Sequence, residues 1–120
     1  MGSTMLPCMH CETRDMKRTG PSYDRAEVAR LARERRVVAT LRVRSWLMNH
    51  GYDATETMVE LLTSLEKLGR WTGSTELMNG EVADEYVVPG GDEDWYVKFS
   101  VDGEQVVVIV WSCCWDGAVH

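Results

Sequence analysis

A tyrosine and two cations form the pattern in this 120-residue chain that most suggests chemistry. Tyr96 and Lys98 are two positions apart in the run Trp95–Val101, where apolar and polar residues alternate. Because successive side chains of a strand point to opposite faces, this spacing places the phenol and the ammonium on one face. Arg70 lies at the start of an earlier strand-like segment and completes the candidate catalytic set.

These residue types suit the cleavage of RNA without a metal. A phenol can donate a hydrogen bond or move a proton, and fixed cations stabilise the charge that develops on phosphorus. The same spacing also fits an ordinary amphipathic strand with a polar outer face, so spacing alone leaves both interpretations open.

The four cysteines occur as two close pairs. Cys8 and Cys11 have the C-x₂-C spacing with which two thiolates bind one zinc ion. The other pair, Cys113–Cys114, is adjacent, and a disulfide between such neighbours is rare. Zinc needs four ligands, which this second pair with His10 or His120 would supply only if the two chain ends meet. Cys8 and Cys11 are therefore the candidate ligands of a structural zinc, with free thiols in a mobile tail as the alternative.

The formal net charge of −6 is unevenly distributed along the chain. Residues 1–50 carry ten Lys and Arg against five Asp and Glu, whereas residues 51–120 carry three against fourteen. Bulk charge therefore does not indicate a nucleic-acid-binding protein, although the N-terminal helices could present a basic face. The chain has no glycine-rich phosphate loop and no metalloprotease or serine-hydrolase motif. No apolar run approaches the roughly 20 residues of a membrane span and no signal-peptide pattern is present, so we expect a cytoplasmic protein.

Helical periodicity and capping residues predict helices in the first half of the chain. We expect residues 1–21 to form a flexible N-terminal segment that carries the C-x₂-C motif, and residues 22–120 to form a single domain. Ser22 is the expected N-cap of the first helix, and Asp53 with Glu56 has the spacing of a capping box. The expected helices span residues 22–36, 40–50 and 53–68.

From Arg70 onward the period changes from that of a helix to that of a strand. The expected strands span residues 71–77, 82–88, 95–101 and 106–111. Asp102-Gly103 lies between the last two, which predicts a two-residue type I′ hairpin. The run Val106–Trp111 is apolar on both faces, which indicates a central strand covered on both sides. Helices followed by a meander of strands predict an α+β fold, with N-terminal helices packed on an antiparallel sheet of about three to five strands.

Several segments of the chain carry a resemblance to a known protein family. They are Lys17–Tyr23, the two helices after it, the Leu61–Trp71 junction, Asp84-Glu85-Tyr86 before Pro89, and Trp95–Phe99 running into Val107–Trp111. Together, from about Lys17 to Cys114, they resemble the MqsR family of toxins from bacterial type II toxin–antitoxin pairs. The resemblance implies a RelE-like fold and a sequence-selective, metal-independent mRNA endonuclease that a cognate antitoxin neutralises.

The resemblance also assigns site residues. The family's strand tyrosine and the lysine after it fall on Tyr96 and Lys98. Its other catalytic positions are degenerate here, and they fall near Thr72, where Arg70 is the nearest cation, near Ala83, and near Cys113 or Cys114.

Three functional hypotheses follow, the third being a small zinc-assisted module in which Cys8 and Cys11 dock the N-terminal tail. In the first, the chain is an endoribonuclease toxin that cleaves single-stranded mRNA with Tyr96, Lys98 and Arg70, and its protein partner is an antitoxin. In the second, it is a catalytically inactive MqsR-like module that binds or inhibits a protein through the acidic face of its sheet. The first two hypotheses require no cofactor for catalysis, and a structural zinc is compatible with either of them.

Overall fold

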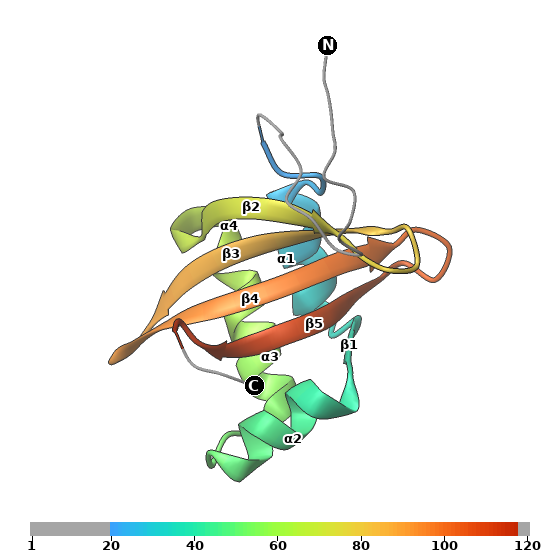
Figure 1. The fold of residues 1–120 in the computed structure, drawn as a ribbon. Coiled ribbons are helices and arrows are strands. Elements are labelled where there is room, and N and C mark those ends of the chain that lie inside the picture. Colours follow the sequence, from blue (N-terminus) through green and yellow to red (C-terminus); the bar gives the residue numbers. More distant parts are fainter. Residues whose placement is uncertain (1–19, 118–120) are drawn as a thin grey trace.

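A computed structural model describes residues 20–117 and gives an α+β fold, as the sequence predicts (Figure 1). The sheet order is β1-β5-β4-β3-β2, and all neighbours are antiparallel except β1, which runs parallel to β5. The elements in chain order are α1 (Arg25–Arg33), β1 (Val37–Ala39), α2 (Leu41–Asn49), α3 (Ala54–Thr63), α4 (Leu65–Leu68), β2 (Arg70–Glu76), β3 (Val82–Gly90), β4 (Glu93–Asp102) and β5 (Val107–Trp115).

The four strands predicted after residue 70 are antiparallel as expected, and the additional strand β1 makes the sheet mixed. Val37 pairs with Val108 and Ala39 with Val110 in parallel register. Parallel neighbours need a long crossover between them, and here the helices and the other three strands provide it.

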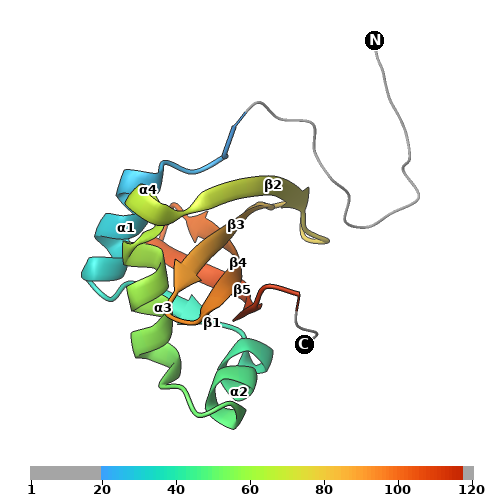
Figure 2. The same ribbon diagram turned by 90° about the vertical axis from the view of Figure 1, so that its left-hand side faces the viewer.

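The helices lie to one side of the sheet. Figure 2 shows α1, α3 and α4 on one face, with α2 below the end of the sheet. The side chains fully buried between these layers include Leu31, Leu62, Leu65, Tyr86, Phe99 and Val110. Within residues 20–117 no helix covers the other face, although Cys114 on that face of β5 is buried. The expectation that β5 is covered on both sides stays a prediction. No helix among these residues is long and apolar enough to cross a membrane.

The helix termini follow the expected capping rules with two corrections. Asp24, not Ser22, is the N-cap of α1, and its carboxylate accepts from the Ala26 amide. Asp53 caps α3 as expected by accepting from the Glu56 amide at 3.0 Å. The predicted third helix is divided into α3 and α4 at Ser64, whose hydroxyl donates to the Glu60 carbonyl. The Ser64 amide donates to the same carbonyl at 3.1 Å.

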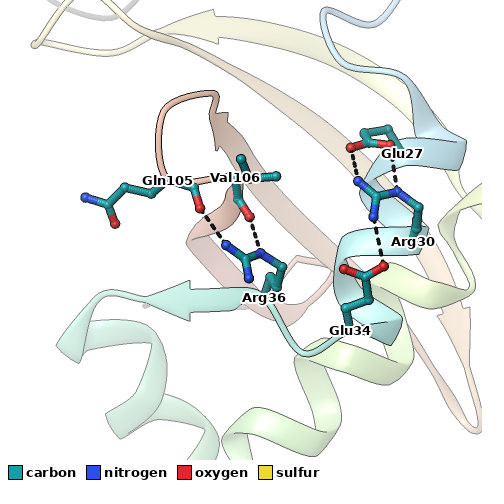
Figure 3. Close-up of polar contacts among 6 residues, drawn as sticks. All are labelled: Glu27, Arg30, Glu34, Arg36, Gln105 and Val106. Atoms are coloured by element: carbon teal, nitrogen blue, oxygen red, sulfur yellow. Dashed lines mark hydrogen bonds and ion pairs between the residues drawn. The ribbon is translucent and has the colours of Figure 1, made fainter.

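The connection between β4 and β5 is longer than the predicted two-residue turn. The Asp102 side chain accepts from the amides of Glu104 and Gln105, and the residue with positive φ is Val106, at 56°. The Arg36 guanidinium holds this loop by donating to the Gln105 and Val106 carbonyls at 2.8 and 2.7 Å (Figure 3). The loop therefore depends on a cation about 70 residues earlier in the chain, which no local turn signal contains.

The basic character of α1 is partly neutralised within the helix. Arg30 pairs with Glu27 and Glu34 on the exposed surface (Figure 3). The expected basic helical face is thus weaker than the sequence count indicates.

An aromatic cluster joins α2 to the ends of β4 and β5. His50 stacks on Trp46 with ring centroids 3.9 Å apart, and Trp46 meets the edge of Trp115 at 5.2 Å. The Trp115 indole donates to the Tyr52 hydroxyl, and the Tyr52 ring contacts Trp95. Offset and edge-on ring contacts of this kind contribute more stability than the buried area alone provides. They therefore hold α2 against the ends of β4 and β5.

The buried carboxylate of Asp84 connects α1 to the sheet. Asp84 has no solvent exposure and accepts hydrogen bonds from the Ser22 and Tyr23 amides and from the Ser74 hydroxyl, at 2.7 to 3.0 Å. Its partners belong to the segment before α1 and to β2. A buried charge is tolerated only when its hydrogen-bonding capacity is filled, so this arrangement fixes the entry into α1.

We expect Asp84→Asn to lower the free energy of unfolding by about 2–3 kcal/mol, because the new amide NH₂ would face amide donors in a buried site. Urea denaturation of the purified chain measures this change. Asp53→Asn is the matched control, since Asn and Asp cap helices about equally well and its cost should be near zero. Equal stability of the two variants would contradict the role given to Asp84.

Cys113 lies on the helix side of β5 with no solvent exposure, in register with Val97. Burial, and to a lesser degree the neighbouring thiol of Cys114, raises the pKa of Cys113 to about 12. The native fold therefore favours the protonated Cys113 thiol, whereas the same thiol in the unfolded chain ionises near pH 8.5.

We expect this thiol to make the fold sensitive to alkali. Because the folded pKa is raised, its contribution is complete below about pH 8.5 and declines by up to about 1.4 kcal/mol per pH unit as the pH rises toward 12. Urea unfolding under reducing conditions at pH 7.5, 9 and 10 measures the decline. Cys113→Val should show a shallower dependence, since any packing change shifts stability equally at every pH. Parallel curves for the two proteins would refute this explanation.

Candidate functional site

The face of the sheet away from α1, α3 and α4 carries all three sequence-predicted catalytic residues. We call it the open face and define it by Arg70, Glu85, Tyr96, Lys98 and Trp111. Residues paired directly across neighbouring strands share a face. The pairs Arg70–Val87 and Val87–Tyr96 place Arg70 with Tyr96, and the pair Glu85–Lys98 lies one step along the same two strands. The predicted shared face of Tyr96 and Lys98 is therefore confirmed.

Two bulges flank the centre of the open face. The register of β2 against β3 skips Thr72, and the register of β5 against β4 skips Trp111. Both bulges lie beside one row across the sheet, Gly73–Glu85–Lys98–Ser112. Bulges bend strands and redirect side chains, and they are frequent beside active sites. The sheet is thus irregular on both sides of the Glu85–Lys98 pair.

Glu85 connects two hydroxyl groups of the open face. The Tyr96 hydroxyl donates to its Oε1 at 2.8 Å, and the Thr75 hydroxyl donates to its Oε2. Burial raises the pKa of Tyr96 well above its usual range, and the hydrogen bond to Glu85 and the charge of Glu85 add to this effect. Cys114 and Asp116 contribute further negative charge. Tyr96 therefore keeps its proton at neutral pH and donates the hydrogen bond that the Glu85 carboxylate accepts.

Lys98 places a cation on the same face as Tyr96 and Glu85. It lies opposite Glu85 in the strand register and is partly exposed. Within residues 20–117 its ammonium makes no hydrogen bond or ion pair. A phenol, a carboxylate and an ammonium group thus occur together on the pair β3–β4.

Arg70 lies on the same face but farther from this group. It is exposed, and Val87 on β3 separates it from Tyr96 on β4. Two strand spacings correspond to about 10 Å between the backbones. Arg70 therefore lies apart from Tyr96 and Lys98 on this face.

Sequence reasoning did not assign Glu85 or Thr75 to the site. Both lie on strands other than that of Tyr96, and the register that brings them together is not readable from local spacing. The sequence pointed to Glu85 only through the segment Asp84-Glu85-Tyr86, which is part of the family resemblance.

The cysteines show no metal site in the described part of the chain. Cys8 and Cys11, the candidate zinc ligands, lie outside the described residues. Cys113 faces the helices, whereas Cys114 pairs with Tyr96 on the other face of β5. In residues 20–117 no group of three or more His, Cys, Asp or Glu residues is placed to bind a metal.

A depression of about 780 Å³ lies elsewhere, beside the segment that enters α1 and the β4–β5 loop. Its charged lining residues are Glu81, Asp102 and Glu104. Carboxylates repel a phosphate backbone, so this depression does not suit RNA as well as the open face does.

Comparison with known proteins assigns no family or function to the chain. No protein-family model, no curated protein and no solved structure matches the chain.

Proposed function

We propose that this chain is a metal-independent endoribonuclease that cleaves single-stranded RNA on its open face. The observation that carries the proposal is the Tyr96–Glu85 hydrogen bond, with Lys98 opposite Glu85 and its ammonium unpaired among residues 20–117. These three groups supply the proton donor, the proton acceptor and the positive charge that cleavage by the neighbouring 2′-hydroxyl requires.

The proposed reaction is an internal transesterification. Glu85 accepts the proton of the 2′-hydroxyl as the bond from O2′ to phosphorus forms. Lys98 stabilises the negative charge on the non-bridging oxygens, which is greatest in the transition state. The bond from phosphorus to O5′ breaks, and Tyr96 donates its proton to the departing O5′. The products are a 2′,3′-cyclic phosphate and a 5′-hydroxyl end.

The hydrogen bond between Tyr96 and Glu85 also returns both side chains to their starting protonation states after the reaction. The attacking and departing oxygens lie on opposite sides of phosphorus, so substrate binding has to separate the two side chains. When the products leave, the bond re-forms, and the proton taken by Glu85 passes to the Tyr96 phenolate. Arg70 lies where it can hold a neighbouring phosphate, which would orient the strand.

The family resemblance supports the biological setting of this proposal. A toxin with mRNA as its substrate and a cognate antitoxin as its protein partner fits the likeness around Trp95–Phe99. The antitoxin would then act by covering the open face or by holding it closed.

A second candidate function is supported by carboxylates at one end of the open face. The Asp116 amide donates to the Asp94 carbonyl at 2.8 Å, which brings two exposed acidic residues together beside Tyr96. Such an acidic rim favours a basic protein partner over RNA. In this alternative the chain is a catalytically inactive binding or inhibitory module.

Cleavage of a fluorogenic, unstructured RNA in the presence of EDTA tests the first proposal. We expect wild-type protein to cut, and Tyr96→Phe, Glu85→Gln and Lys98→Ala each to lower the single-turnover rate by roughly 10²–10³-fold, as is typical for a lost acid, base or charge-stabilising group. Arg70→Ala should mainly weaken substrate binding. The cut fragments should carry cyclic phosphate ends.

Matched controls are Lys67→Ala and Glu60→Gln, which alter exposed groups on the helix side and should leave the rate unchanged. If the wild type and all three site variants cut RNA at equal rates, the reaction does not take place on the open face. If the wild type does not cut at all, the inactive binding module becomes the better proposal.

A further inference from the structure

The bulge in β5 gives the open face an aromatic residue that the proposed reaction does not use. Lys98 pairs with Ser112, and the next residue, Phe99, pairs with Val110, so Trp111 is the extra residue. Val110 is fully buried on the helix side, which directs Trp111 to the open face. Without the bulge Ser112 would face the helices. The bulge instead places Trp111 and Ser112 together across from Lys98.

A hydrogen bond fixes the indole of Trp111. Its Nε1 donates to the Ser100 hydroxyl at 2.9 Å. Ser100 is two residues after Lys98 on β4 and therefore points to the same face. The indole thus extends over β4 on the side of Lys98, yet Trp111 remains partly exposed. A ring held in one orientation loses little conformational entropy when a ligand contacts it.

We propose that Trp111 is a stacking platform for one base of single-stranded RNA, on the nucleotide whose phosphate Lys98 binds. This inference rests on the proposed function and adds the recognition element of the same site. A nucleotide combines a flat ring with an anion, and the open face combines a fixed aromatic ring with an uncommitted cation. An apolar peptide would match the indole but would leave the ammonium without a counter-ion.

The platform selects unpaired RNA. In a duplex both faces of each base are already stacked, whereas a single strand can offer a base to an aromatic side chain. Stacking on one indole is tolerant of sequence, because every base has an aromatic face. Ser100 acts as a positioning residue, since it orients the indole without contacting the base.

Binding of a short 2′-O-methyl RNA tests the platform separately from cleavage, because this probe lacks the attacking hydroxyl. We expect Trp111→Leu to weaken binding at least fivefold in fluorescence anisotropy, and Trp111→Phe to retain most of the affinity. Ser100→Ala should give an intermediate loss. Circular dichroism and urea midpoints at the wild-type values would establish that the variants are folded.

Abasic probes identify the base involved. We replace each nucleotide of the probe in turn with an abasic sugar and measure binding to wild type and to Trp111→Leu. At one position the abasic probe should bind both proteins equally, because neither complex then contains the stack. An equal loss from Trp111→Leu at every position would overturn the platform.

The outcomes separate this inference from the proposed function. Binding that is unaffected by Trp111→Leu, with cleavage intact, overturns the platform alone. Binding that depends on Trp111, with no cleavage of normal RNA, overturns the catalytic proposal and supports the platform. A wild type that neither binds nor cuts overturns both.

Discussion

The buried carboxylate of Asp84 is the contact on which the two layers of this molecule depend. It receives hydrogen bonds from the chain entering α1 and from Ser74 on β2, so a helix and two strands meet at one charge. Any shift of α1 over the sheet would leave that charge unsatisfied in a site without solvent. Glu85 follows directly and faces the other way, because side chains alternate along β3. The dipeptide Asp84-Glu85 therefore fixes the scaffold on one face and supplies the carboxylate that accepts the Tyr96 hydrogen bond on the other.

The parts of the fold that were predictable from sequence are those encoded by local periodicity. The alternation in Trp95–Val101 predicted which side of β4 is buried, and Asp53 marked the start of α3, because both signals lie within a few residues. The errors arose from contacts between distant segments. Val37–Ala39 is too short to signal a strand by itself, and it pairs with β5 some 70 residues later. The Asp102-Gly103 signal was overridden by a loop that Arg36 holds from outside.

In the candidate site, too, local spacing placed some residues, and contacts between distant segments placed the others. Tyr96 and Lys98 could be placed together because the period of a strand is two, and this pair alone follows from one segment. Glu85 joins them only through the register of β3 against β4, and Trp111 reaches the open face only because of a bulge. Neither register nor bulge position has a reliable local signature. The sequence thus predicted that Tyr96 and Lys98 share a face, but not that the Glu85 carboxylate accepts the tyrosine's hydrogen bond.

The charge of the chain explains why an aromatic ring matters for the proposed activity. Residues 70–117 contain two cations, Arg70 and Lys98, against ten Asp and Glu. Electrostatic affinity for a single strand grows with the number of phosphates that are neutralised, so two cations supply only a small part of it. A fixed indole adds affinity that does not depend on net charge. The acidic surroundings suppress general attraction of nucleic acid, and an unpaired nucleotide whose base reaches Trp111 while its phosphate reaches Lys98 is then favoured by local fit. In this view the low positive charge of the sheet restricts which RNA can be bound, and it does not by itself argue against cleavage.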